Sequence, residues 1–287
     1  MARLTVPKTY KLAIGGAFPR SESGRTYEVT TAKGAFLANA ALASRKDARD
    51  AVVAARAAQP GWSGATAYNR GQVLYRIAEL LEGRHAQFTA EIAASEGVSA
   101  AVAGRQVDAA VDTWVWYAGW TDKFAQVAGS GNPVAGPYFN LSVPEPTGVV
   151  AIVAPQEATG ASLLGFVSVV APALVAGNTV VVIADEAHPL SAISLAEVLA
   201  TSDVPGGVVN VLTGSPAEIA PWLASHADVN ALDLTGAGAL DWVELEIAAA
   251  DTLTRVIGPE PGVPDRSLGR ILALTETKTV WHTKSLL

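Results

Sequence analysis

The 287-residue sequence contains no cysteine. A thiolate is the side chain best suited to nucleophilic attack at neutral pH, so covalent catalysis by cysteine is excluded for this chain. The same absence excludes disulfide bonds, cysteine–zinc sites and thiol redox switches.

Charged residues are also scarce, at 16% of the chain, and acidic residues outnumber basic ones to give a formal net charge of −7. Without a basic stripe to neutralise phosphates, we expect no nucleic-acid or anionic-membrane partner. No uninterrupted apolar run reaches the roughly 20 residues of a membrane span. The first ten residues lack the apolar core of a secretory signal. We therefore expect a cytoplasmic protein.

Hydrophobic residues are abundant, and in the second half of the chain they form short apolar runs separated by helical patterns. The runs cover residues 148–154, 179–183, 208–212, 229–234 and 254–257. Buried strands that alternate with helices are typical of a parallel sheet with helices on both faces. The sequence thus predicts an α/β fold with a doubly wound, Rossmann-like, five-stranded parallel sheet.

The first half is predicted to be mainly helical, over residues 44–58, 69–82, 84–96 and 103–128, with Pro60-Gly61 ending the first helix. The last segment carries Trp114, Trp116, Tyr117 and Trp120. Such a cluster indicates either a ligand-binding site or a buried helix face, and we favour the buried helix face.

Several segments, taken in order, resemble the aldehyde dehydrogenase superfamily. They are IGGAFPRSESGRTYEV (14–29), WVWYAGWTDK (114–123), EPTGVVAIVAP (145–155), APALVAGNTVVVIADEAHPLSA (171–192), VPGGVVNVLTG (204–214), HADVNALDLTG (226–236) and TKTVWH (277–282). In that family a catalytic domain carrying the nucleophilic cysteine follows the fifth strand. Here a Pro/Gly-rich linker occupies that place, so the chain resembles a truncated form that lacks the catalytic domain and its cysteine.

The resemblance implies a division into five segments. Residues 1–136 form the N-terminal hairpin and helical region of the cofactor domain, and 137–147 an oligomerisation strand. Residues 148–257 form the Rossmann-like domain, 258–266 the linker that replaces the catalytic domain, and 267–287 a C-terminal oligomerisation tail. A β oligomerisation ribbon is therefore expected from the two extended segments.

The resemblance also marks positions where catalytic groups are expected to be degenerate. The family's Pro-Trp-Asn segment, whose amide stabilises an oxyanion, is matched by Pro155-Gln156-Glu157. An ionised Glu157 accepts hydrogen bonds and would repel an oxyanion. The family's catalytic base falls near Glu260, which has proline on both sides, and we predict a solvated side chain there. We assign no catalytic residue and, because the four histidines lack ligand spacing, no metal ligand.

The cofactor positions are mixed. Glu186, Thr235 and Gly236 match the family's binding motifs, whereas Ile183 stands where the family has a lysine that reaches the cofactor ribose. Asp241 falls near a helix start that receives the pyrophosphate in the family, and its charge opposes phosphate binding. We expect no bound cofactor, with weak binding of NAD or NADP as the alternative.

The assembly segments are retained although the catalytic machinery is absent. This favours a pseudoenzyme that is not catalytic on its own and that forms a hetero-oligomer with a full-length NAD(P)-dependent aldehyde dehydrogenase paralogue, which it stabilises or regulates. Three alternatives stay open. The chain could be a homo-oligomeric scaffold, an NAD(H)-binding sensor, or an oxidoreductase with altered chemistry at Glu157 or Asp185.

Overall fold

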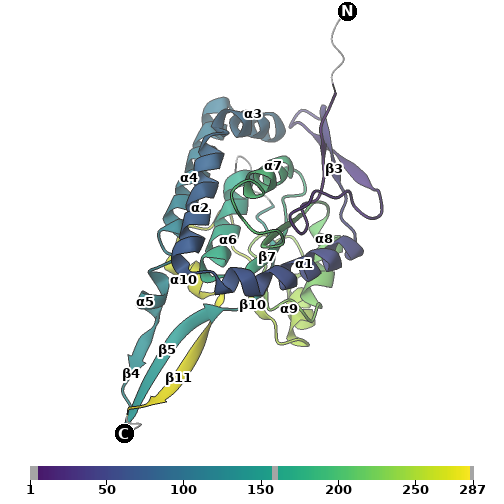
Figure 1. The fold of residues 1–287 in the computed structure, drawn as a ribbon. Coiled ribbons are helices and arrows are strands. Elements are labelled where there is room, and N and C mark those ends of the chain that lie inside the picture. The colour runs from purple at the N-terminus through teal and green to yellow at the C-terminus, as the bar shows by residue number, and fades with distance from the viewer. Residues whose placement is uncertain (1–5, 157–160, 285–287) are drawn as a thin grey trace, which may run out of the picture.

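The computed structural model describes residues 6–156 and 161–284, and its centre is a five-stranded parallel sheet (Figure 1). The strands are β6 (Val149–Val153), β7 (Thr179–Ile183), β8 (Val209–Leu212), β9 (Ala231–Asp233) and β10 (Arg255–Ile257). They are arranged in the order β10-β9-β6-β7-β8, with every pair parallel. The predicted doubly wound sheet is confirmed.

Successive residues of each central strand face two separate hydrophobic cores, because side chains alternate across a sheet. Val150, Ile152 and Val180 belong to one core, and Val149 and Ala151 to the other. This two-sided burial explains why the strands read as continuous apolar runs.

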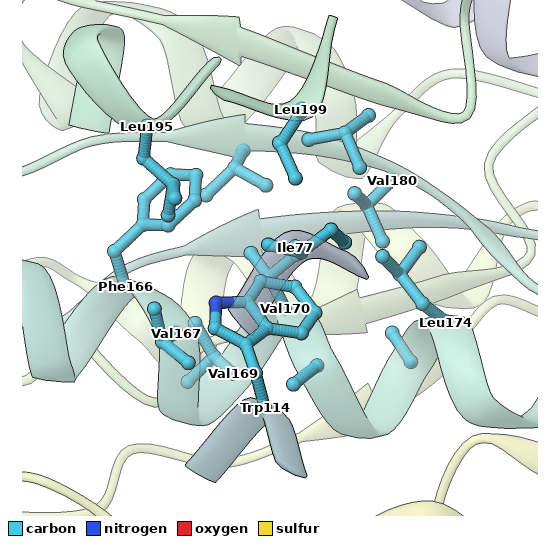
Figure 2. Packing of buried hydrophobic residues seen from close by; sticks show 14 of the residues in the cluster. Ile77, Trp114, Phe166, Val167, Val169, Val170, Leu174, Val180, Leu195 and Leu199 are labelled. Atoms are coloured by element: carbon cyan, nitrogen blue, oxygen red, sulfur yellow. The ribbon is translucent and has the colours of Figure 1, made fainter. Parts of the chain in front are cut away.

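The larger core lies between the sheet and helices α6 (Ser162–Ala176) and α7 (Leu190–Leu199), which a second helical layer covers. That layer consists of α2 (Ala67–Glu82), α3 (His85–Glu96) and α4 (Ala100–Ala118). Figure 2 shows Trp114 of α4 packed among Ile77, Val170 and neighbouring residues. Trp114 and Tyr117 are fully buried, which confirms the buried helix face.

The smaller core lies on the opposite face of the sheet, under α1 (Arg45–Gly64), α8 (Pro216–Ala224) and α9 (Trp242–Ala250). Ser44 and Asp47 form a capping box at the start of α1. The helix continues past Pro60 to Gly64, so the predicted stop at Pro60-Gly61 is wrong. The buried Trp62 accounts for the extension, because its indole N–H donates to the carbonyl of Leu174.

The helix predicted over residues 103–128 is two helices. It breaks after α4, and the short helix α5 (Phe124–Ala128) follows a turn. Gly119 caps α4, and the Thr121 hydroxyl donates to the carbonyl of Ala118. Hydrogen bonding of a threonine side chain to the preceding turn competes with helix continuation.

Two further sheets lie outside the central one. The first joins β1 (Thr9–Tyr10), β3 (Phe36–Ala41) and β2 (Thr26–Thr30) near the start of the chain. The second joins β4 (Ser130–Asn132), β5 (Tyr138–Pro146) and β11 (Thr275–Thr283), and it projects from the body of the molecule (Figure 1). β5 and β11 pair antiparallel over nine residues, from Thr275 opposite Pro146 to Thr283 opposite Tyr138. We call this β5–β11 pair the ribbon.

The segment between β10 and β11 contains only a loop and the short helix α10 (Leu268–Leu272). α10 contacts α6. The side-chain amide of Asn178 donates to the carbonyl of Leu274, and this hydrogen bond anchors the end of the segment beside the start of β7. The loop passes the carboxyl end of β9, where the N–H of Glu260 donates to the carbonyl of Thr235, before the chain reaches β11.

Candidate functional site

A cavity of about 430 Å³ opens at the carboxyl ends of the central strands. It lies beside β6 and β9, where the strand order reverses, which is the place where open α/β sheets bind ligands. Its lining residues come from the ends of β6 and β9 and from the loop after β10: Pro155, Gln156, Thr235, Gly236, Gly238, Ala239, Pro259, Glu260, Pro261 and Gly262. We call it the strand-end cavity.

Gln156 closes one side of this cavity by joining the ends of two strands. Its side-chain amide donates to the carbonyls of Ala154 at 2.6 Å and Ala184 at 3.3 Å. Its Oε1 accepts the backbone N–H of Glu186 at 3.0 Å. Gln156 therefore uses its hydrogen-bonding capacity on the protein itself, across the crevice between β6 and β7.

The side chain of Arg270 in α10 extends to the carboxyl end of β9, next to the strand-end cavity. Its guanidinium lies 3.2 Å from Oδ2 of Asp233 and 2.9 Å from Oε2 of Glu260. It also donates to the Thr235 hydroxyl at 3.1 Å. Burial raises the pKa of Asp233, and the Arg270 charge acts in the opposite direction. The result is a four-residue network in which Thr235 and Glu260 line the cavity and Asp233 and Arg270 lie behind them.

The structure places Glu260 on the cavity wall with 51% of its side chain exposed. Its backbone N–H donates to the carbonyl of Thr235 at 3.2 Å, and its carboxylate is paired with Arg270. The prediction of a solvated side chain missed this ion pair.

Thr235 and Gly236 lie together at the end of β9, as their motif suggests. The Thr235 hydroxyl donates to Asp233 at 2.5 Å, so it is already engaged with protein groups. Gly236 lies against the end of β6, where an added Cβ would overlap the carbonyl of Ala154. Glycine is required here so that the two strand ends can approach each other closely.

Asp241 is the N-cap of α9, where its side chain accepts the N–H of Glu244 at 3.4 Å. Glu244 places a second acidic residue in the first turn. Two carboxylates at a helix start compete with a phosphate for the positive end of the helix dipole.

The start of α6 is also occupied by protein groups. Oε1 of Glu96 accepts the N–H of Ser162 at 3.2 Å, and Oε1 of Gln106 accepts the N–H of Leu163 at 2.7 Å. Glu96 and Gln106 are both buried. An anion would have to displace these side chains to reach the helix N-terminus.

Comparison with known proteins identifies the family. The model of the aldehyde dehydrogenase family matches residues 18–257, which is most of the chain. The chain belongs to the aldehyde dehydrogenase family.

Two curated relatives are named as dehydrogenases of a folate derivative. Mouse cytosolic 10-formyltetrahydrofolate dehydrogenase is 34% identical over 242 residues, which cover 82% of this chain and 26% of the relative. The human cytosolic protein of the same name is 33% identical over 240 residues, again 26% of its length. The chain thus spans about a quarter of the curated relatives it matches.

Solved structures agree with the fold. PnpE from Pseudomonas sp. WBC-3 matches with a TM-score of 0.79 and 29% identity, over 87% of this chain and 50% of PnpE. An NAD-dependent aldehyde dehydrogenase from Sinorhizobium meliloti matches with a TM-score of 0.79 and 25% identity, over 88% and 50% of the two chains. The aligned part of each enzyme is about half of its chain.

Within this aldehyde dehydrogenase-like chain, the two remaining cofactor positions lie at the end of β7. Ile183 is fully buried within the strand and belongs to the smaller core. Glu186 is exposed in the loop that follows. The side chain of Ile183 therefore offers no polar atom to a ribose, whereas Glu186 keeps the residue that the motif has at its position. Glu157 lies outside the described residues.

Asp185, the second alternative catalytic residue, is buried between β7 and α7 and is not part of the strand-end cavity. Its Oδ1 accepts the N–H of His188 at 2.8 Å, and Nδ1 of His188 lies 3.1 Å from the Ser95 hydroxyl. Its Oδ2 is buried without a hydrogen-bond partner among the described residues. Burial raises the pKa of Asp185 to about 6, although the His188 N–H and side chain act against this.

The sequence did not single out Arg270 or Asp233, and it gave Gln156 no definite role. Asp233 lies in an apolar strand, where burial of an unpaired carboxylate would be costly. Its position in that strand was therefore the sequence signal that a cationic partner exists. Its partner lies 37 residues later, in a helix of five residues. Within residues 6–156 and 161–284, no three histidine or acidic side chains are grouped so that they could hold a metal ion, and no helix is long and apolar enough to cross a membrane.

Proposed function

We propose that this chain is a non-catalytic member of the aldehyde dehydrogenase family that assembles with a full-length NAD(P)-dependent aldehyde dehydrogenase and stabilises or regulates it. The sequence supports the first half of this proposal, because a chain without cysteine has no thiolate to form the family's covalent intermediate. The polar groups of the strand-end cavity support it too, since Gln156, Thr235 and Glu260 are committed to protein partners.

One observation carries the second half of the proposal. The ribbon exposes an apolar face made by alternate residues of β5, with Phe139, Leu141 and Val143 exposed by 58%, 43% and 41%. Val280 of β11 lies opposite Leu141 and extends this face. Exposed apolar side chains in a row are typical of a surface that a partner covers.

The other face of the ribbon has a polar, internally bonded centre, and the packed aromatic pair Tyr138 and Trp281 lies exposed beside it. Asn140 is buried, Asn132 donates to both Asn140 and Ser142, and the hydroxyls of Ser142 and Thr279 lie 2.9 Å apart. β11 is an edge strand of nine residues, so its outer main-chain groups are free of strand partners within the described sheet. A free edge next to an apolar face suits the addition of a strand from another subunit.

The test is co-expression with a full-length paralogue, followed by size-exclusion chromatography and native mass spectrometry. The expected result is a stoichiometric heteromer. Leu141→Asp should abolish it, because a charge would be placed on the apolar face. Thr277→Asp is the matched control and should leave assembly intact, because Thr277 lies opposite Pro144 on the other face of the ribbon. A lack of association with every paralogue of the source organism would refute the proposal.

A second candidate function is an NAD(H)-binding sensor or an oxidoreductase with altered chemistry. The position of the strand-end cavity at the switch point between β6 and β9 favours it, since this is where dinucleotides bind in such sheets. Calorimetry with NAD and NADP separates the two functions. A dissociation constant in the micromolar range would favour the sensor, whereas no heat of binding together with heteromer formation would favour the non-catalytic subunit.

A further inference from the structure

A groove lies between the first turns of α1 and the end of α8. It consists of two cavities, of about 240 Å³ and 370 Å³, that share Arg45 and Arg49. Their lining residues are Glu22, Ser44, Arg45, Lys46, Ala48, Arg49, Trp222, Leu223, Ser225 and His226. We call this the α1–α8 groove. It shares no residue with the strand-end cavity.

Arg45 is the central charge of the groove. Its guanidinium lies 3.9 Å from the centre of the Trp222 ring, and no carboxylate among the described residues pairs with it. An arginine whose guanidinium lies over an aromatic ring keeps the N–H groups at the edge of the guanidinium free for an anion.

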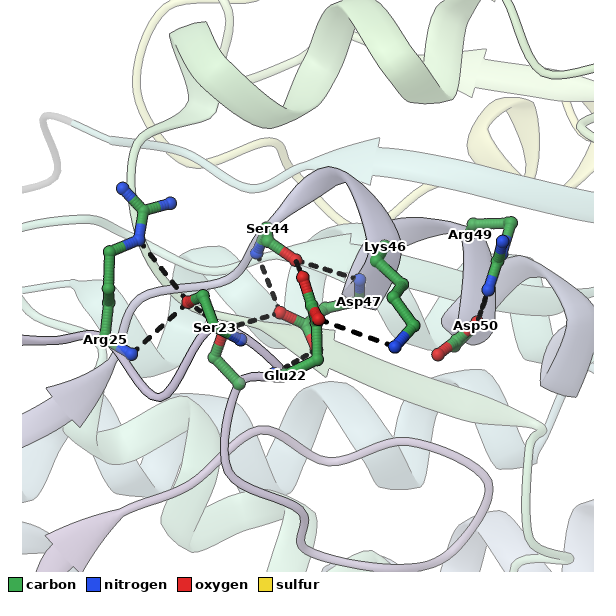
Figure 3. Close-up of polar contacts among 9 residues, drawn as sticks. Glu22, Ser23, Arg25, Ser44, Lys46, Asp47, Arg49 and Asp50 are labelled. Atoms are coloured by element: carbon green, nitrogen blue, oxygen red, sulfur yellow. Dashed lines mark hydrogen bonds and ion pairs between the residues drawn. The ribbon is translucent and has the colours of Figure 1, made fainter.

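Arg49 and Lys46 add positive charge that is held only weakly. Arg49 pairs with its neighbour Asp50 at 2.9 Å, and Lys46 pairs with Glu22 at 3.4 Å. Each of these four side chains is at least 40% exposed, so solvent screens both pairs. Figure 3 shows Lys46 and Arg49 extending from the same turns of α1.

Asp47 does not cancel this charge, because it is turned into the protein. It is buried, and its carboxylate accepts hydrogen bonds from the Ser21 hydroxyl at 2.7 Å, from the Ser44 N–H at 2.8 Å and from the Glu22 N–H at 3.1 Å (Figure 3). The helix start is thereby capped by protein groups. The positive charge of the groove therefore comes from its basic side chains and not from the helix dipole.

The far wall of the groove adds a polar donor and an apolar floor. Nδ1 of His226 accepts the N–H of Asp228 at 3.1 Å, so a neutral His226 carries its proton on Nε2. Ala48 and Leu223 are buried at 1% exposure each and form the floor, and Trp222 is 42% exposed above it. The groove thus combines cations, a ring N–H and an apolar surface.

We propose that the α1–α8 groove binds a small organic anion: a phosphate monoester or carboxylate joined to an aromatic or aliphatic body. Arg45 and Arg49 bind the anionic group in the two-pronged manner that suits guanidinium, and His226 donates to it from the opposite wall. The body of the ligand lies against Trp222 and the Ala48–Leu223 floor. This site is independent of the assembly proposed above and of the strand-end cavity.

Calorimetry on the intact chain with phenyl phosphate as the probe tests the proposal. We expect saturable binding in the sub-millimolar range that weakens as salt is raised, because the contacts are between charges. Phenylacetate should bind at the same place. Its binding should change the fluorescence of Trp222, and the Trp222→Phe variant should lack this change. Inorganic phosphate and benzyl alcohol should each bind at least tenfold more weakly, since each lacks one half of the ligand.

Matched variants separate the groove from general electrostatics. Arg45→Gln combined with Arg49→Gln should weaken phenyl phosphate binding by at least tenfold. Arg105→Gln, a change of an exposed arginine on α4, should leave binding unchanged. Circular dichroism confirms that each variant is folded. Equal binding by the double variant, or no saturable binding by the unaltered chain, would overturn the proposal.

Discussion

The side-chain carbonyl of Gln156 accepts the backbone N–H of Glu186 at 3.0 Å and so joins the loops that follow β6 and β7. The amide end of the same side chain donates to the carbonyls of Ala154 and Ala184. One side chain thus satisfies main-chain groups of two neighbouring strand ends. The residue that follows the proline in the family's Pro-Trp-Asn segment has become a structural link in this chain.

Gln156→Ala should therefore lower the stability of the fold. It removes three hydrogen bonds and leaves the Ala154 carbonyl without its side-chain donor, so we expect a loss of about 2 kcal/mol in the free energy of unfolding. Urea titration measures it. Gln126→Ala is the matched control, because Gln126 is exposed and makes one side-chain bond, to the Asp122 carbonyl. Equal losses in the two variants would contradict the role of Gln156 as a link.

Arg270 should be indispensable because it pairs with a fully buried carboxylate. Arg270→Met leaves the Asp233 charge without its cation, and we expect a loss of about 3 to 5 kcal/mol in the free energy of unfolding at neutral pH. Arg76→Met, which breaks the exposed pair with Asp203, should cost less than about 1 kcal/mol. A similar small loss in both variants would refute this account of Asp233.

The pH dependence of the Arg270→Met effect gives an independent readout. Burial already raises the pKa of Asp233, and removal of Arg270 raises that pKa further. An acid that binds its proton more tightly when folded loses stability as the pH rises through the range between its unfolded and folded pKa values. The destabilisation by Arg270→Met should therefore be largest at neutral pH and decrease as Asp233 becomes protonated.

The parts of the fold that depend on local patterns could be predicted from sequence. The apolar runs of β6 to β9 predicted the sheet because these strands are buried on both faces. The half-buried edge strand β10 was predicted from a shorter apolar run. A Gly-Asn pair is a local signal for a helix end, and α6 ends at such a pair, where Gly177 adopts a φ of +99° that disfavours other residues. The helix through Pro60 was missed because the tertiary contact of Trp62 with Leu174 outweighs the local signal.

The interactions within the candidate site were harder to predict from sequence, because they join residues that are far apart in the chain. Nothing in the local sequence of Arg270 indicates that it approaches Asp233 or Glu260. The role of Gln156 depends on two strand ends that only the folded sheet brings together. Asp241 could be placed from sequence, because an aspartate before a helical pattern is a typical N-cap, and the structure places it there.

Asp185 should make stability depend on pH in the mildly acidic range. Burial raises its pKa from 3.8 to about 6 in the folded chain, so ionisation favours the unfolded state. Its contribution to stability is fully present below pH 4 and is lost as the pH rises to about 6 and above. A shift of about 2 pKa units corresponds to about 3 kcal/mol.

Asp185→Asn tests this, because the amide is neutral at every pH and its oxygen can still accept the His188 N–H. We expect the variant to match the unaltered chain at pH 4 and to exceed its free energy of unfolding by up to about 3 kcal/mol at pH 8. Asp112→Asn, on an exposed part of α4, should show no such divergence. Parallel stability curves for Asp185→Asn and the unaltered chain would show that Asp185 does not ionise as proposed.

Gly236 and Gly238 form a natural matched pair in the loop after β9. A Cβ on Gly236 would overlap the Ala154 carbonyl and lie 2.7 Å from the Pro155 nitrogen, and both of these are main-chain atoms that cannot rotate away. Gly236→Ala should therefore push β9 and β6 apart at their ends and cost about 3 kcal/mol. Gly238 has open space around its Cβ position, so Gly238→Ala should be neutral or stabilise by up to about 1 kcal/mol. Thermal unfolding of the two variants compares them directly. Because both glycines line the strand-end cavity, a large loss confined to Gly236→Ala would show that this glycine is kept for strand packing, whether or not a ligand binds beside it.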